Sequence, residues 1–150
     1  MLHLEFYNET KDPVSGRIFE EILNIINENF KEIFPDTLDK RKQYFISCTL
    51  IDERLMKEIN KQHRGIDKTT DVVSLGYLEE NSFPGNDMIG EIFISVPTAK
   101  KQAKKLDHDT LTEIKFLFVH GVLHILGYEH REEKDFQLMM ELTNQILALK

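Results

Sequence analysis

Hydrophobic residues recur at helical or alternating spacing along most of the chain. Apolar positions three and four residues apart predict an amphipathic helix over residues 15–33. The β-branched and aromatic residues at 43–51 are typical of a buried strand. Shorter strands are predicted at 3–7, 72–75 and 88–95, where similar runs are bounded by polar residues, Gly or Pro. The first two-thirds of the chain therefore supplies the strands of a small sheet.

Helices dominate the remainder of the pattern. A capping box, Thr110–Glu113, precedes the most apolar helix of the chain, which should stop at Gly127. A last helix is expected to pack through apolar residues that include Phe136 and Met139. We therefore expect an α+β (mixed α/β) fold in a single domain, residues 1–150, with about four strands in a mixed sheet and about five flanking helices.

Composition narrows the class of protein without identifying it. Hydrophobic residues make up 41% and charged residues 30% of the 150 residues, which is typical of a globular domain. The formal net charge of −7 argues against a protein that coats nucleic acid by bulk electrostatics, although a local basic groove is compatible with it. The single cysteine, Cys48, excludes an intrachain disulfide. With neither a secretory signal nor a membrane-spanning run, we expect a cytoplasmic protein without a membrane partner.

Three histidines form the sharpest chemical pattern, in the segment HGVLHILGYEH that begins at His120. Because His120 and His124 are four residues apart, they lie on one helix face, about 6 Å apart along the axis, and can reach one metal ion. Gly127 then ends the helix, so that His130 can fold back toward the same point. A catalytic zinc ion is often held by three imidazoles and has an open fourth coordination position. We therefore expect one Zn²⁺ per chain on this C-terminal metal-binding helix, although nickel, copper and iron also bind imidazole.

The same spacing matches the zinc-ligand frame of the metzincin proteases. Those enzymes have a glutamate directly after the first histidine as general base, and this chain has Gly121 there. A zinc peptidase is therefore an alternative that lacks its usual base. A glycine at this position is also expected to leave space beside the metal for a bulky substrate.

The histidine segment resembles the signature of the YbeY family of bacterial endoribonucleases. Residues 60–74, NKQHRGIDKTTDVVS, are similar to the family's loop and strand with an arginine and a T-D-V-L-S run. Residues 89–95, IGEIFIS, resemble its G-D-I-x-I-S strand, so the likeness covers roughly residues 55–135 in matching order. The family usually has aspartate where this chain has Glu91 and Glu129, which keeps the charge and lengthens the side chain by one methylene.

This resemblance implies a single-domain, metal-dependent hydrolase. Its implied activity is single-strand-specific endoribonuclease cleavage in the maturation of the 3′ end of small-subunit ribosomal RNA and in ribosome quality control. The implied partners are ribosomal RNA and the small subunit or 70S particles. Arg64, in a loop predicted over residues 63–71, is the implied catalytic residue, because a guanidinium can hold a phosphate and stabilise transition-state charge.

Two alternatives to this catalytic reading remain open at the level of sequence. Without the resemblance, Arg64 would be interpreted as a surface residue in an ion pair with Asp67 or Asp71. The whole protein could correspondingly be a non-catalytic ribosome assembly factor in which the metal is structural.

Positive charge for an RNA partner is concentrated in the lysine-rich segment 99–106, AKKQAKKL. Ala99, Ala103 and Leu106 are spaced as its buried stripe, which places its four lysines on the outer face. A solvated helix face is the plain interpretation, and a track for the RNA backbone is the functional one. The sequence shows no alternation of aromatic residues typical of a base-stacking platform.

Overall fold

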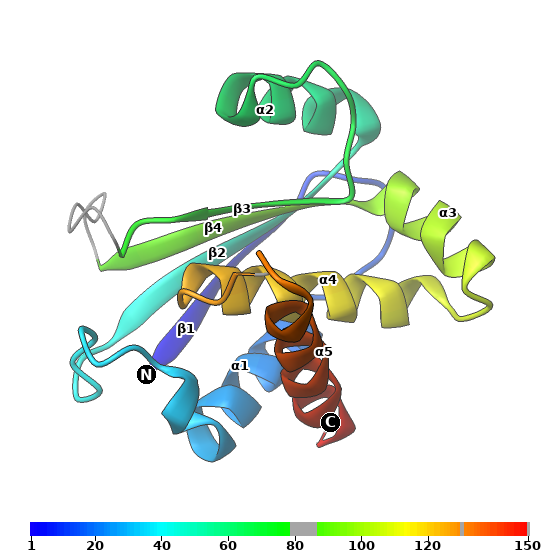
Figure 1. The fold of residues 1–150 in the computed structure, drawn as a ribbon. Helices are drawn as coiled ribbons and strands as arrows, with labels where there is room; N and C mark the ends of the chain where they lie inside the picture. Colours follow the sequence, from blue (N-terminus) through cyan, green and yellow to red (C-terminus); the bar gives the residue numbers. More distant parts are fainter. Residues whose placement is uncertain (79–86, 130, 150) are drawn as a thin grey trace.

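A mixed β-sheet forms the centre of the computed structural model, which describes residues 1–78, 87–129 and 131–149. The sheet has four strands in the described residues: β1 (Leu2–Asn8), β2 (Tyr44–Ile51), β3 (Val72–Gly76) and β4 (Met88–Ser95). Their order is β1-β2-β4-β3 (Figure 1). Strands β1, β2 and β4 are parallel, and β3 runs antiparallel to β4 at one edge. The predicted mixed sheet is confirmed.

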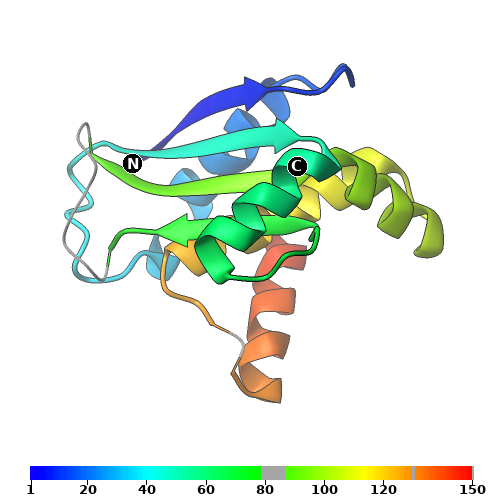
Figure 2. The same ribbon diagram turned by 90° about the horizontal axis from the view of Figure 1, so that it is seen from above.

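Helices cover the two faces of the sheet unequally. The described part of the chain contains one short 3-10 helix, η1 (Lys31–Ile33), and five α-helices: α1 (Arg17–Asn29), α2 (Glu53–Arg64), α3 (Val96–Lys105), α4 (Thr110–Ile125) and α5 (Glu133–Ala148). Helices α1, α4 and α5 lie on one face and α2 lies on the other (Figures 1 and 2). None of the helices in these described ranges is long and apolar enough to cross a membrane. The expected α+β fold is therefore confirmed.

Two glycines lie at the contact between helix α4 and the sheet, where a larger residue would meet a neighbouring side chain. A Cβ added at Gly90 of β4 would lie 2.4 Å from the Ile125 side chain. A Cβ added at Gly121 of α4 would lie 3.0 Å from the side chain of Ile92. The expectation that Gly121 leaves space beside a metal is wrong, because this buried glycine faces the sheet and Ile92 occupies the space.

Two helix boundaries differ from the sequence prediction. The loop predicted over residues 63–71 begins later, because α2 continues through Arg64 and is capped by Gly65, whose φ of +71° suits glycine. At α4 the capping residue is Asp109 rather than Thr110, since the Asp109 carboxylate accepts a hydrogen bond at 2.8 Å from the backbone N–H three residues later. Both side chains are good caps, and the extended backbone of Asp109, where the chain enters α4, decides between them.

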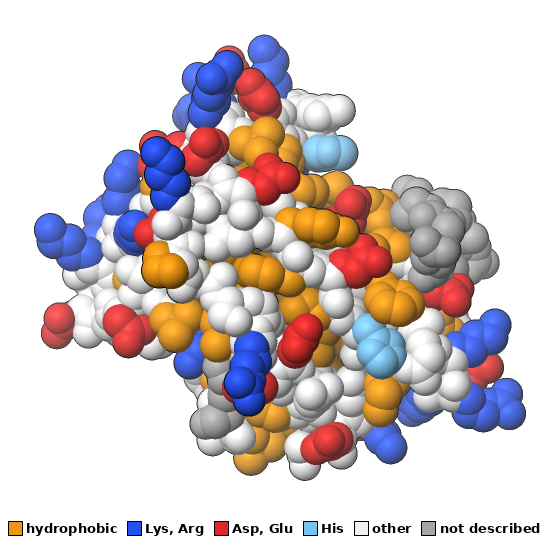
Figure 3. Space-filling view, turned by 180° about the vertical axis from the view of Figure 1, so that it is seen from behind, with side chains coloured by type: hydrophobic (Ala, Val, Ile, Leu, Met, Phe, Trp, Pro, Cys, Tyr) orange, Lys and Arg blue, Asp and Glu red, His pale blue; other side chains and the backbone are white. Residues whose placement is uncertain are grey.

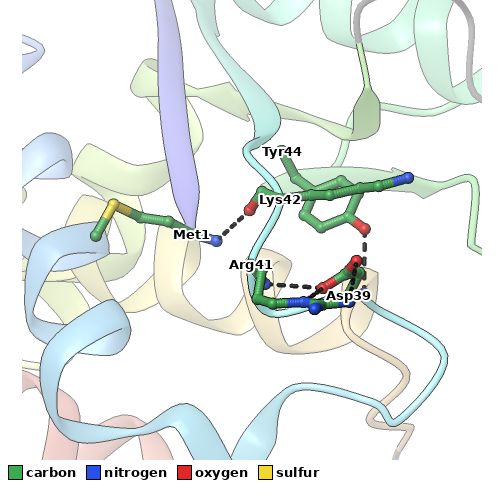
Figure 4. Close-up of polar contacts among 5 residues, drawn as sticks. All are labelled: Met1, Asp39, Arg41, Lys42 and Tyr44. Carbon is green, nitrogen blue, oxygen red and sulfur yellow. Dashed lines mark hydrogen bonds and ion pairs between the residues drawn. The ribbon is translucent and has the colours of Figure 1, made fainter.

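The connection between η1 and β2 is fastened by a group of polar contacts (Figure 4). The ammonium of Met1 donates to the carbonyl of Lys42 at 2.8 Å, and the backbone N–H of Asp39 donates to the Tyr44 hydroxyl at 3.2 Å. Arg41 donates to the Asp39 carboxylate from its backbone N–H at 2.9 Å and from Nε at 3.2 Å. These two bonds, the backbone one foremost, lower the pKa of Asp39. The contacts hold a loop whose first residues border a cleft beside α4.

Candidate functional site

His120 and His124 project from α4 on its partly open side, away from the buried core. Their Nε2 atoms lie 3.2 Å apart, and the two rings meet edge to face with centroids 4.7 Å apart. Both side chains are half-buried, whereas the residues between them on α4, positions 121–123, are buried. The helical spacing therefore brings the two histidines together as the sequence predicts.

The distance between these nitrogens can be compared with a metal site. Two nitrogen ligands of a tetrahedral zinc ion, each about 2.0–2.1 Å from the metal, are about 3.3 Å apart. The observed separation of 3.2 Å fits this requirement, and imidazole nitrogen is a ligand that zinc accepts readily. The third predicted ligand, His130, lies outside the described residues. Within the described ranges, no group of three or more His, Cys, Asp or Glu side chains forms a metal site.

The chain reverses immediately after α4. Gly127 adopts a φ of +107°, and its N–H donates to the carbonyl of His124 at 3.0 Å. The N–H of Tyr128 donates to the carbonyl of Leu123 at 2.9 Å, which completes a Schellman motif. Gly127 is therefore the left-handed stop that the sequence predicts, and the chain through Glu129 borders the same cleft as His124.

A cleft of about 480 Å³ opens between the end of α2, the edge strand β3 and the helices α4 and α5. Its lining on the side of α2 and β3 is Arg64, Asp71, Val72 and Ser74. Its lining on the helical side is Phe116, Leu117, His120, His124, Phe136 and Met140. Segments that are distant in the sequence thus place the predicted arginine and both described histidines around one space.

A second cleft, of about 460 Å³, also has His124 in its lining. It is bordered by the loop after η1, through Pro35 and Thr37, and by the turn after α4, through Glu129. His124 therefore contributes to the lining of both clefts.

Arg64 is exposed at the last position of α2. The alternative ion pair of Arg64 with Asp67 or Asp71 does not form. Asp67 pairs with Lys57 at 3.9 Å, and the Asp71 carboxylate accepts hydrogen bonds from the next backbone N–H at 2.8 Å and from Gln102 at 3.2 Å. Arg64 has no ion pair among the residues that the structure describes, so its guanidinium can meet an anion that enters the cleft.

The cleft contains two aromatic residues, Phe116 and Phe136, that the sequence analysis did not identify as candidate site residues. The ring of Phe116 stacks on the imidazole of His120, with centroids 5.9 Å apart and planes at 18°. Its position one helical turn before His120 was readable from the sequence. Phe136 was expected in the apolar stripe of the last helix, but it is 41% exposed, whereas Met139 is buried. No local signal distinguishes the two, because both fit the same helical period.

The carboxylates that depart from the family pattern lie in different surroundings. Glu91 is on β4 and accepts a hydrogen bond from the Tyr77 hydroxyl. Glu129 borders the second cleft and pairs with Arg131, whose Nε lies 2.6 Å from its carboxylate. Neither lines the cleft that contains Arg64.

Lysine and arginine side chains gather over α2 and α3 on the face seen in Figure 3. The four lysines of α3 are exposed, but Lys100 pairs with Asp12 at 2.5 Å and Lys101 pairs with Glu53 at 2.9 Å. The alanines of the predicted stripe are buried, whereas Leu106 is 61% exposed, so that part of the expectation is wrong. Pairing with acids reduces the charge that α3 offers to RNA.

Comparison with known proteins identifies the family. The model of the family described as Endoribonuclease YbeY matches residues 2–149. A relative from Geobacillus kaustophilus named Endoribonuclease YbeY is 35% identical, with 98% of this chain and 95% of the relative covered. One of the same name from Persephonella marina is 45% identical, with 67% of each chain covered. The solution structure of a Thermotoga maritima protein, 21% identical, shares the fold with a TM-score of 0.61 over 97% of this chain and 90% of that one. The chain therefore belongs to the YbeY endoribonuclease family.

Proposed function

We propose that this protein is a zinc-dependent endoribonuclease that cleaves single-stranded ribosomal RNA. Its proposed role is maturation of the 3′ end of small-subunit ribosomal RNA and quality control of ribosomal particles in the cytoplasm. The observation that supports this most directly is the cleft in which Arg64 faces the same space as two histidines whose Nε2 atoms are 3.2 Å apart. The names of the curated relatives support the same activity.

Different residues of the cleft would have different roles in phosphodiester cleavage. A bound Zn²⁺ ion would polarise a phosphoryl oxygen and lower the pKa of water. His120 and His124 would hold it through Nε2, with His130 as the third ligand. Arg64 would bind the scissile phosphate through its planar fork and stabilise the negative charge that grows on it in the transition state. Its exposure at the end of α2 leaves it accessible to a polymer.

The charge distribution favours RNA that is presented by a ribosomal particle over free RNA that the protein would have to attract from solution. With a net charge of −7, loose RNA is attracted only weakly. Lys104 and Lys105 have no ion pair among the described residues and lie at the end of α3. They can track a phosphate backbone, but two cations do not offset the overall charge. A ribosomal particle that presents the RNA would supply the missing affinity.

The peptidase alternative finds no support in the packing of α4. Residue 121 is where a metzincin has its general base, and here it is a glycine packed against Ile92. The chain therefore supplies no base at that position.

The proposal is tested by measuring metal content and cleavage of a single-stranded ribosomal RNA fragment in purified variants. We expect about one metal per chain in the wild type and in Arg64→Ala, and a large loss of metal in His124→Ala. Cleavage should fall by about 100- to 1,000-fold in Arg64→Ala, the usual effect of removing a group that stabilises transition-state charge. His63→Ala is the matched control, because His63 is exposed beside Arg64 and does not line the cleft.

Each alternative gives a different result. Cleavage that persists in His124→Ala would assign the activity to a contaminating nuclease and refute the proposal. An assembly factor with a structural metal would show normal ribosome assembly in cells that express Arg64→Ala, whereas His120→Ala would unfold the domain.

A further inference from the structure

We infer that the outer face of α2 binds the phosphate backbone of the RNA on one side of the cleavage site. This surface, the α2 ridge, consists of five cations from α2 and the loop after it: Arg54, Lys57, Lys61, Arg64 and Lys68. The inference rests on the proposed cleavage of RNA. It adds the course of the substrate outside the cleft.

Four of the five cations form a stripe along α2. Arg54, Lys57, Lys61 and Arg64 are spaced by three, four and three residues, which places them within about 80° of the helix circumference. All four are exposed, and lysine and arginine side chains gather over α2 at the top of Figure 3. The stripe is about 15 Å long, since each residue adds about 1.5 Å. A stacked strand with one phosphate per about 3.4 Å would bring about four phosphates along it.

The loop after α2 adds the fifth cation and is fixed to the helix. The side-chain amide of the buried Asn60 donates a hydrogen bond to the carbonyl of Lys68 at 2.8 Å. Helix α2 and this loop border a hollow of about 680 Å³, whose lining is Glu53, Arg54, Lys57, Asp67, Lys68 and Thr69. Three of the five cations therefore surround one concave surface.

The cations of the α2 ridge are available to an anion. Arg54, Lys61 and Lys68 have no ion pair within the described ranges, and all three are exposed. Lys57 lies 3.9 Å from Asp67, but both side chains are more than half exposed. Such a pair contributes little, so a phosphate can replace the carboxylate as the partner of Lys57.

Acidic residues of the same region reduce its positive charge without cancelling it. Glu53 pairs with Lys101 of α3 at 2.9 Å, and Glu58 is exposed on α2 next to the ridge. Residues 53–68 still contain five cations and three acids, a net charge of +2 in a chain whose net charge is −7. This local excess is complementary to the charge of a phosphate backbone.

Arg64 connects the α2 ridge to the cleft. It is the last residue of α2 and lines the cleft together with His120 and His124. An RNA strand whose scissile phosphate is bound by Arg64 would have its neighbouring phosphates next to Lys61 and Lys57. Contacts of this kind position the backbone without reading the bases, so the ridge would add affinity without sequence preference.

The test removes two cations of the ridge that do not line the cleft, in the variant Lys57→Gln/Lys61→Gln. The matched control, Lys11→Gln/Lys40→Gln, removes the same charge from exposed loop positions that line neither cleft. Binding of a single-stranded ribosomal RNA fragment is measured at about 50 and about 200 mM salt, where phosphate contacts differ strongly in strength. Thermal unfolding checks that each variant is folded.

The salt dependence reports the number of phosphate contacts. Each contact with a single strand contributes about 0.7 to the slope of log affinity against log salt. With two contacts removed, the wild type should lose about sevenfold more affinity than Lys57→Gln/Lys61→Gln over this fourfold change in salt. The control variant should lose as much as the wild type.

Cleavage kinetics distinguish the ridge from the reacting groups. Because the ridge contacts RNA away from the scissile phosphate, Lys57→Gln/Lys61→Gln should raise KM and leave kcat unchanged. Shortening the RNA at one end, but not at the other, should weaken binding by the wild type. The same shortening should have little further effect on the variant, because both changes remove the same contacts.

The other outcomes overturn the α2 ridge. Equal losses in Lys57→Gln/Lys61→Gln and in the control would assign the effect to net charge, and an unchanged salt slope would show that the two lysines do not contact phosphates. Wild-type cleavage that still depends on metal and on Arg64 would then leave the proposed function standing. A wild type that neither binds nor cleaves the RNA would overturn both.

Discussion

Replacing His120 with alanine should abolish the stabilisation of the fold by zinc. The two Nε2 atoms of His120 and His124 lie 3.2 Å apart, close to the about 3.3 Å that a tetrahedral zinc site requires. A zinc ion bound by both imidazoles would join two atoms that the helix already holds at this separation, so binding would need little rearrangement of the two. Alanine at position 120 removes one of the two.

The size of the effect follows from linkage. Zinc at 100 times its dissociation constant stabilises a protein that binds it only when folded by about 2.7 kcal/mol. In a chain of this length, 1 kcal/mol raises the melting temperature by about 2–4 °C. The wild type should therefore melt about 5–11 °C higher in zinc than in chelator, and His120→Ala should show little of this rise. Binding of zinc to the unfolded chain, which has six histidines, lowers the expected rise.

The assay is thermal unfolding followed by circular dichroism at pH 7.5, because metal binding to histidine competes with protons and is favoured above acidic pH. Wild type, His120→Ala and His63→Ala are each melted in chelator and in a zinc titration. The exposed His63 controls for adventitious binding, so His63→Ala should shift as the wild type does. A full zinc-dependent shift in His120→Ala would refute the role of this histidine, and the absence of a shift in the wild type would refute the site.

Three further predictions concern the stability of the fold. Asp109→Ala should lower the free energy of unfolding by about 1 kcal/mol, whereas Thr110→Ala should change it by less than about 0.5 kcal/mol; equal losses in urea denaturation would contradict the capping assignment. Gly90→Ala places a Cβ 2.4 Å from the Ile125 side chain and should cost about 1–3 kcal/mol; an unchanged urea midpoint would show that Ile125 moves freely. Burial raises the pKa of Glu113 above its ordinary 4.5, so the stability from its protonated form is present below about pH 4.5 and is lost as the pH rises through the raised pKa. Glu113→Gln should therefore gain stability relative to the wild type as the pH rises toward neutrality, and a difference independent of pH in urea denaturation would disprove this.

The sequence by itself determined the features that depend on near neighbours in the chain. The strand predicted over residues 88–95 has those bounds in the structure, and the glycine stop after the apolar helix is at Gly127. His120 and His124 meet because the helical repeat places residues four apart on one face, whatever surrounds the helix. The quoted motifs also sufficed to indicate the YbeY family, which the comparison over residues 2–149 confirms.

Only the tertiary structure decided which of these features share a space. Arg64 lines the histidine cleft because α2 ends beside the edge strand β3, and its position in the chain does not reveal this. Gly121 faces Ile92 rather than the cleft. Phe136 is exposed and Met139 is buried, although both positions fit the helical spacing of apolar residues in α5. Periodicity fixes the face of a helix on which a residue lies. What that face meets is set by packing between segments that are far apart in the sequence, and this arrangement decides which residues can act together on a substrate.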